Sequence, residues 1–115
     1  MSGTQLNRAL KNSASIFAAL GDQTRLSLVA RLSRGEPLSI TCLSSGANVT
    51  RQAITKHLHV LAEAGVVRGF RNGREQLWQL ERRRLDEAKD SLEIISRQWD
   101  GALARLKSLV EEDSQ

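Results

Sequence analysis

Apolar residues recur at helical spacing through most of this chain, and glycines or short polar stretches separate the segments that they define. Residues 4–20 carry an apolar position every three or four residues, which places these side chains on one face of a helix. Asp22 is expected to cap a second helix, which stops at Gly35, and Pro37 lies in the connection that follows. The pattern therefore predicts a helical amino-terminal half.

Two further helices joined by a tight turn are predicted within residues 39–64. Ser39 is expected to cap a short helix that ends near Gly46, and Thr50 to cap a longer one that has Gly65 just after its C-cap. One side of the longer helix is apolar. Its opposite, outward face carries Thr50, Arg51, Gln52, Thr55, Lys56 and His59. This arrangement is typical of a helix-turn-helix.

Residues 66–80 predict a β-hairpin. Asn72-Gly73 is a strong signal for a two-residue loop, because a type I′ turn needs a positive φ at both positions. With that loop, Arg71 faces Arg74 across the turn. Like charges directly opposite one another are unfavourable, so we expect this pair to lie against an anion.

The same register pairs Val67 with Trp78, on a face that we expect to lie against the core. The candidate contacts of the hairpin with a polyanion are Arg68, Arg71, Asn72 and Arg74. Contacts with phosphates or the minor groove would position the protein without reading much sequence. The alternative is an edge hairpin whose charges prevent aggregation, and both interpretations can hold.

A long helix is predicted over residues 83–112. Its apolar residues recur every seven positions, and again three residues after each, at Leu85, Leu92, Trp99 and Leu106 and at Ala88, Ile95, Ala102 and Leu109. Such a seam over about four heptads is typical of a coiled coil, and a core of this size cannot cover it.

We therefore expect dimerisation through residues 4–20 and 83–112. The predicted contacts are Leu6, Leu10, Phe17, Leu85, Leu92, Ile95, Trp99, Leu106 and Leu109. For Trp99, packing is the main interpretation, and the wall of a ligand pocket is the alternative.

The positive charge of the chain is concentrated in its middle. The net charge is +4, but residues 49–84 carry eight Lys or Arg against three Asp or Glu, whereas residues 85–115 carry four against eight. A positive helix face beside a positive hairpin suits the major groove of DNA and the flanking phosphates. Arg82, Arg83 and Arg84 either reach such phosphates or form a solvated charge run.

Three residues at the start of the longer helix are candidates for reading DNA. Arg51 could bind guanine through two hydrogen bonds, and Gln52 could pair with adenine. Thr50 could bind a phosphate, helped by the helix amino terminus. The alternative is a solvated helix face, and the adjoining cationic hairpin favours DNA over it.

Size and composition predict one domain over residues 1–115. The chain is 26% charged and 40% hydrophobic, as in an ordinary globular protein. Only 3% of its residues are aromatic and none is tyrosine, which excludes a surface rich in stacking aromatics, as in single-strand binders. The amino terminus lacks the apolar segment of a signal peptide, and no apolar run approaches the roughly 18–20 residues of a membrane span. We expect a cytoplasmic protein.

The histidines and the single cysteine suggest no metal site. His57 and His59 are two positions apart and face different sides of the helix, so one chain cannot hold a metal with both. We expect His57 to be a packed, hydrogen-bonded structural residue. Cys42 cannot form an internal disulfide, and we expect a semi-buried apolar residue rather than a redox sensor, because no Lys, Arg or His adjoins it.

Three segments carry a family resemblance: ALGDQTRLSLVARL (19–32), TRQAITKHLHVLAEAGVV (50–67) and GFRNGREQLWQL (69–80). With the order of the predicted elements, they resemble the winged-helix repressors of the ArsR/SmtB-type, or arsenical-resistance-repressor, family over nearly the whole chain. QWDGALARLKSLVEE (98–112) is similar to the last helix of a family branch without metal sites.

The resemblance implies a mostly α fold with a small β-hairpin, a winged helix-turn-helix with a wing at 66–80 and a long carboxy-terminal helix for dimerisation. It implies a homodimeric, cytoplasmic bacterial repressor that binds an inverted-repeat operator. Metal sensors of this family use paired cysteines in the third helix, or Asp, His and Glu on the terminal helices. Here SITCLSSG has Cys42 alone and the terminal helices lack His and Cys, so no metal or cofactor is expected.

Sequence-specific binding of double-stranded DNA is thus the predicted function. The alternative is a winged-helix module that docks on a protein partner through the same face. An enzyme is the least favoured class, since no carboxylate pair, nucleophile with a base, phosphate loop or metal cluster is evident in the sequence.

Overall fold

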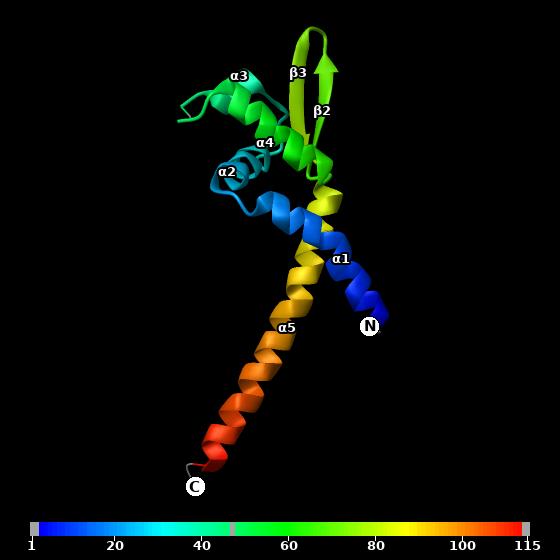
Figure 1. The fold of residues 1–115 in the computed structure, drawn as a ribbon, viewed down its shortest axis with the longest axis vertical. Helices are drawn as coiled ribbons and strands as arrows, with labels where there is room; N and C mark the ends of the chain where they lie inside the picture. The colour runs from blue at the N-terminus through cyan, green and yellow to red at the C-terminus, as the bar shows by residue number, and fades with distance from the viewer. Residues whose placement is uncertain (1–2, 47, 114–115) are drawn as a thin grey trace.

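The computed structural model describes residues 3–46 and 48–113. In chain order, the elements are α1 (Gly3–Leu20), α2 (Gln23–Leu32), β1 (Leu38–Ser39), α3 (Ile40–Ser44), α4 (Arg51–Glu63), β2 (Val67–Asn72), β3 (Glu75–Leu80) and α5 (Arg82–Asp113). Helices α2, α3 and α4 and the sheet gather at one end, and α5 runs away from them along the long axis (Figure 1). The molecule measures 70 × 32 × 21 Å. The mostly α fold with a small β-sheet is confirmed.

Local sequence explains where three of the helices begin. The side chains of Asp22, Ser39 and Thr50 each accept a hydrogen bond from the backbone N–H three residues later, at 3.0, 3.2 and 3.1 Å. Each bond satisfies one of the N–H groups that lack a partner in the first turn, so the predicted N-caps are confirmed. Helix α2 is shorter than predicted. It ends at Leu32, whose carbonyl accepts the N–H of Gly35 in a turn beyond the helix.

Helix α4 ends in a Schellman motif built on Gly65. This glycine has φ +77°, a conformation that costs a glycine little. Its N–H donates to the Ala62 carbonyl, and the N–H of Val66 donates to the Leu61 carbonyl. The predicted role of Gly65 is confirmed, and the chain turns there from α4 into β2.

The core is mostly aliphatic, with Trp78 as its buried aromatic residue. The apolar side of α4 faces inward, since Ile54, Leu58 and Leu61 are at most 1% exposed. They pack with buried residues of the other elements, which are Ile16, Ala19, Leu28, Leu32, Leu43, Ala64, Val66, Val67, Trp78 and Ala88.

The sheet has a third strand that the sequence analysis missed. Its order is β1-β3-β2, and the antiparallel pairing of β1 joins Leu38 to Trp78 and Ser39 to Leu77. Two residues after Pro37 cannot show the alternation of apolar and polar positions by which a strand is recognised. The helix-turn-helix is therefore tied to the hairpin through β1.

The predicted register of the hairpin is wrong by one position at the turn. Asn72 pairs with Glu75 and Arg71 with Gln76, so the loop is Gly73-Arg74. Only Gly73 has a positive φ, +65°, as in a type II′ turn, which needs glycine at its first central position and leaves Asn72 in the strand.

Arg71 therefore does not face Arg74, and the predicted pair of opposed arginines does not form at this turn. Val67 pairs with Leu80, and Trp78 lies opposite Gly69. The cross-strand partner of each residue is two positions from the predicted one. Because alternate residues of a strand point the same way, Val67 and Trp78 still lie on the predicted core face. Both are buried.

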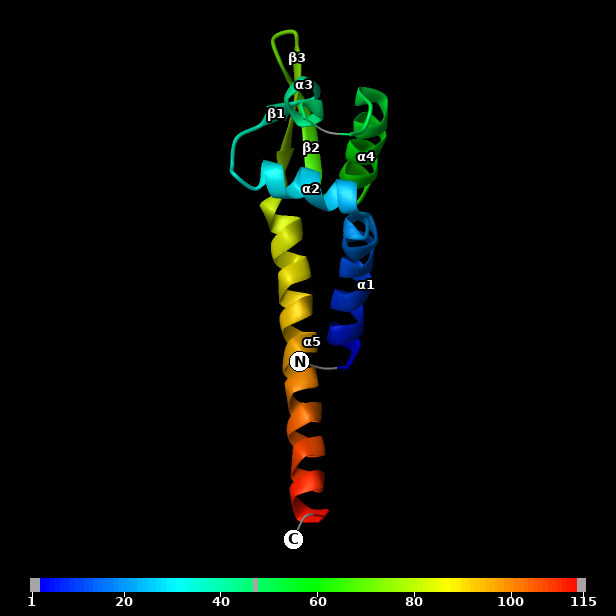
Figure 2. The same cartoon turned by 90° about the vertical axis from the view of Figure 1, so that its left-hand side faces the viewer.

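Helix α1 lies alongside the amino-terminal half of α5 (Figure 2). The hydroxyls of Ser13 and Ser91 are 2.8 Å apart, and both residues are 1% exposed. Beyond α1, the distal part of α5 extends alone. Phe17 and Leu85, both predicted dimer contacts, pack against the core of their own chain.

The apolar seam of distal α5 is uncovered in the single chain. Its exposed members are Leu92, Ile95, Trp99, Leu103, Leu106, Leu109 and Val110. No helix in the described part of the chain is long and apolar enough to cross a membrane.

Candidate nucleic-acid interface

The outward face of α4 is polar and cationic, as predicted. Arg51, Gln52, Lys56 and His59 are exposed, and the last three extend from the face opposite the buried stripe. Thr55 is half-buried, and its hydroxyl donates to the Arg51 carbonyl at 2.9 Å. Its capacity to contact a ligand is therefore partly used within the helix.

Thr50 stands where the helix amino terminus is open. Its Oγ1 accepts the Ala53 N–H, which leaves its own O–H free to donate. The residue is exposed, and the partial positive charge of the helix end favours an anion at this point.

The hairpin β2–β3, called the wing below, carries its candidate contact residues near its tip and, for Arg68, further along β2. Arg71, Asn72 and Arg74 are exposed at and near the tip. Arg71 shares a sheet face with Trp78, because alternate residues of a strand point the same way. Arg68 lies on the other face, where its Nε is 3.1 Å from Oε1 of Glu81, so its charge is partly compensated.

Trp78 joins the wing to α4, a role that the sequence analysis missed. Its ring meets that of His59 edge-on, with centroids 5.9 Å apart. On the neighbouring strand, a Cβ at Gly69 would lie 3.0–3.1 Å from two atoms of the Trp78 ring. Glycine thus leaves the space that the indole occupies. The sequence does place Gly69 and Trp78 in one hairpin, but the predicted register paired Trp78 with Val67 instead of Gly69.

Exposed cations lie on α4 and the wing. Arg51, Lys56, Arg71 and Arg74 form no ion pair with the described residues, in contrast to Arg68 and Arg84. In the described part of the chain, no group of three or more His, Cys, Asp or Glu could hold a metal ion. The exposed cations therefore suit an anionic partner.

His57 is the structural histidine that was predicted. The Nδ1 atom of His57 accepts a hydrogen bond from Nη1 of Arg25 at 3.2 Å, because an arginine side chain can only donate. Arg25 also donates to the Ala19 carbonyl, so this contact joins α4 to the ends of α1 and α2. The backbone N–H of Arg25 lowers the pKa of Asp22, the cap of α2, because it stabilises the ionised carboxylate.

Two predictions for neighbouring residues need correction. Cys42 is exposed rather than semi-buried, because Leu43 is the residue of short α3 that points into the core. Arg84 is half-buried and turned inward, and it holds the Ala64 carbonyl and the carboxylate of Glu87. It neither faces flanking phosphate nor belongs to a solvated run, whereas Arg82 and Arg83 are exposed.

Comparison with known proteins agrees with this geometry. Residues 20–69 match the model of a helix-turn-helix domain family. The chain is 33% identical over 97 residues to the HTH-type transcriptional regulator Rv2034 of Mycobacterium tuberculosis, across 84% of this chain and 87% of that protein. The solved structure of an ArsR-like transcriptional regulator from Rhodococcus sp. RHA1 is 36% identical, has a TM-score of 0.71 and is matched across 86% of this chain and 92% of its own. This chain belongs to the ArsR family.

A further HTH-type regulator is similar to part of this chain. The uncharacterized HTH-type transcriptional regulator YuzN of Bacillus subtilis is 41% identical over 69 residues, 55% of this chain and 75% of that protein. As an ArsR-family regulator, the chain is a winged helix-turn-helix protein of a DNA-binding class. The resemblance inferred from three sequence segments is confirmed.

Proposed function

We propose that this ArsR-family protein is a homodimeric, sequence-specific repressor that binds an inverted-repeat operator in double-stranded DNA. One observation carries the proposal: the unpaired cations of α4 and the wing belong to adjoining surfaces, which the contact between His59 and Trp78 joins. A helix fits the major groove, and a cationic hairpin beside it can follow the phosphates.

We assign different tasks to the two surfaces. On α4, Arg51 reads guanine and Gln52 reads adenine, with Thr55, Lys56 and His59 completing the contact face and Thr50 donating to a phosphate. On the wing, the residues contact phosphates or the minor groove and position the protein. These residues are Arg68, Arg71, Asn72 and Arg74.

The uncovered seam of α5 supports the proposed dimer. Exposed apolar residues repeat along the helix beyond α1, and a second copy of the same seam would cover them. Two-fold symmetry would then present two α4 helices to half-sites about 34–36 Å apart. Repression would follow where such a site overlaps a promoter. We place the protein in the cytoplasm and assign it no enzymatic activity.

The test is selection of DNA bound by the purified protein, followed by two substitutions. Arg51→Ala should weaken binding to the selected operator by roughly tenfold or more and relax the preference at one base position, since a base contact of this kind contributes about 1–3 kcal/mol. Arg71→Ala should weaken binding to all sequences alike and make it less dependent on salt.

Arg105→Ala, an exposed arginine on distal α5, is the matched control for the loss of charge and should bind DNA as the wild type does. Wild-type binding without sequence preference or salt dependence would contradict the proposal. So would equal effects of all three substitutions. A promoter reporter carrying the selected operator then tests repression directly.

A further inference from the structure

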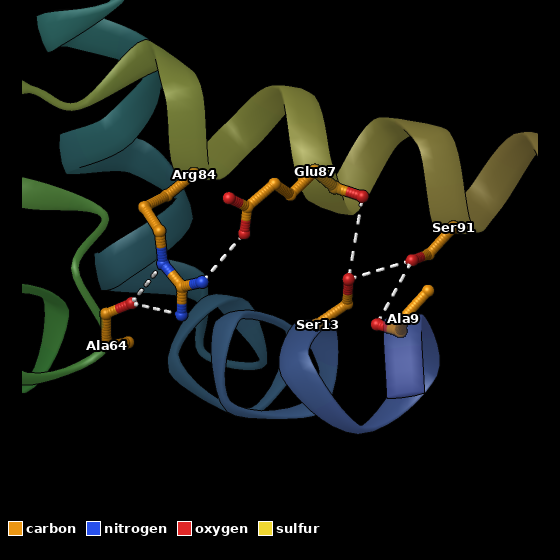
Figure 3. Close-up of polar contacts among 6 residues, drawn as sticks. All are labelled: Ala9, Ser13, Ala64, Arg84, Glu87 and Ser91. Carbon is orange, nitrogen blue, oxygen red and sulfur yellow. Dashed lines mark hydrogen bonds and ion pairs between the residues drawn. The ribbon is translucent and has the colours of Figure 1, made fainter. Parts of the chain in front are cut away.

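Arg84 connects the end of α4 to the first turns of α5. Its Nε and Nη2 donate to the Ala64 carbonyl at 3.3 and 3.2 Å, and its Nη1 lies 2.7 Å from Oε2 of Glu87 (Figure 3). Ala64 is the C-cap of α4. The Arg84 side chain therefore joins α5, which carries the exposed seam, to the end of α4, the proposed recognition helix.

The chemistry suits this position. The carboxy-terminal end of a helix carries partial negative charge and carbonyls without partners, which a cation stabilises. The planar fork of arginine presents two N–H groups to one carbonyl and a third to the carboxylate, which the single ammonium of lysine cannot do. A Cβ on Gly65 would lie 3.0 Å from Nε of Arg84, so the glycine also leaves room for the fork.

Glu87 continues the connection toward α1. Its backbone carbonyl accepts from the Ser13 hydroxyl at 3.5 Å, and Ser13 bonds Ser91, which reaches the Ala9 carbonyl at 3.5 Å (Figure 3). A continuous set of polar contacts thus runs from the end of α4 through α5 to α1. These last two helices are the ones that carry the predicted dimer contacts.

We propose that Arg84 is a positioning residue for DNA recognition: it fixes the orientation of α4 relative to α5, and so the separation of the two recognition helices in the dimer. The inference rests on the proposed function, because only a dimer on a two-part operator requires that separation. Arg84 itself touches no DNA, since its guanidinium is bonded within the chain.

Cys42 supplies a direct test. It is the only cysteine of the sequence and is exposed on α3, so one spin label per chain marks each helix-turn-helix without other changes. Pulsed dipolar spectroscopy on the full-length dimer measures the label-to-label distance without DNA. We expect a narrow distribution for the wild type and a broadened or displaced one for Arg84→Gln. Arg83→Gln, which removes the same charge from an exposed neighbour, should match the wild type.

Binding to DNA gives the second readout. On operators whose half-sites are moved apart or together by one or two base pairs, Arg84→Gln should lose roughly tenfold affinity at the preferred spacing, the usual scale for a lost hydrogen bond to a charged group. Its affinity should fall little on operators with the other half-site spacings, so the variant should discriminate less between spacings than the wild type does. Arg84→Lys keeps the charge and should show the same reduced discrimination, while circular dichroism confirms folding.

The outcomes distinguish a failure of the role proposed for Arg84 from a failure of the proposed DNA-binding function. If Arg84→Gln gives the wild-type distance distribution and spacing profile, Arg84 does not position α4 and the inference is overturned. An equally flattened spacing profile for Arg83→Gln and Arg84→Gln would also overturn it, because that result marks a plain charge effect. If the wild type shows no label-to-label distance or selects no DNA, the proposed function fails and the inference falls with it.

Discussion

Gly69 is the residue at which the wing has no room for a side chain. A Cβ there would lie 2.7 Å from Nε2 of Gln76 and 3.0 Å from the Trp78 ring, so the ring would have to move. We predict that Gly69→Ala lowers the free energy of unfolding by about 1–3 kcal/mol, as overpacking does. Because Trp78 also meets His59, DNA binding should weaken as well. Urea unfolding and an affinity measurement check both effects.

Trp78→Phe provides the control for Gly69→Ala. The smaller ring removes the atoms that the new Cβ would meet, so the double variant should lose less stability than the two single losses added together. Strict additivity would show that Gly69 is constrained by something other than the indole.

Asp22 gives a prediction about pH. The hydrogen bond from the Arg25 N–H lowers the pKa of this carboxyl, so the folded state favours its ionised form. The resulting stabilisation is present above the ordinary pKa of 3.8 and is lost as the pH falls through the lowered pKa. Asp22→Asn keeps a capping side chain without the charge.

Urea unfolding of wild type and Asp22→Asn, at neutral pH and then in acid, measures this effect. The wild type should be the more stable protein at neutral pH, and the difference should shrink in acid. A difference that stays constant across this range would contradict the ionised cap.

At the scale of the elements, the stability of α4 depends on its N-cap, Thr50. Thr50→Ala removes the acceptor of the Ala53 N–H, and we predict a loss of about 1 kcal/mol in the free energy of unfolding. Thr50→Ser keeps the oxygen and should remain close to the wild type. Unfolding followed by circular dichroism measures both. If serine and alanine are equally destabilising, the methyl group rather than the cap bond matters.

The elements also show where prediction from sequence succeeds. Helix starts were predicted because a cap is local: the acceptor and its N–H lie three residues apart. The hairpin was placed correctly, but its loop was not, since Asn72-Gly73 and Gly73-Arg74 are both acceptable two-residue turns. Strand β1 was missed because its two residues become a strand only by pairing with β3.

At the scale of the molecule, α5 is 32 residues long, about 48 Å at 1.5 Å per residue, and only its first part is covered by the same chain. We predict that Leu92→Glu, on the exposed seam, shifts the protein from dimer to monomer. A carboxylate would lie in an apolar contact between two copies, where burying a charge is costly. Sedimentation at several concentrations measures the shift.

Leu26→Glu is the matched control for this experiment. Leu26 on α2 is 52% exposed and Leu92 is 53% exposed, so both substitutions should change the stability of the single chain by a similar amount. The α2 variant should sediment as the wild type does. If both variants, or neither, change the association state, the seam is not the dimer contact.

The sequence by itself determined the local features of this protein: the caps, the inward stripe and outward cationic face of α4, the hairpin and the heptad seam. Each depends on residues only a few positions apart. Tertiary structure decided the rest, because it depends on residues that meet from distant parts of the chain. It turned Arg84 from a neighbouring arginine run toward Ala64, set Trp78 between Gly69 and His59, and left Cys42 exposed. Charge alone could not show which arginines remain free for a ligand, since that depends on which carbonyls and carboxylates the fold brings within reach.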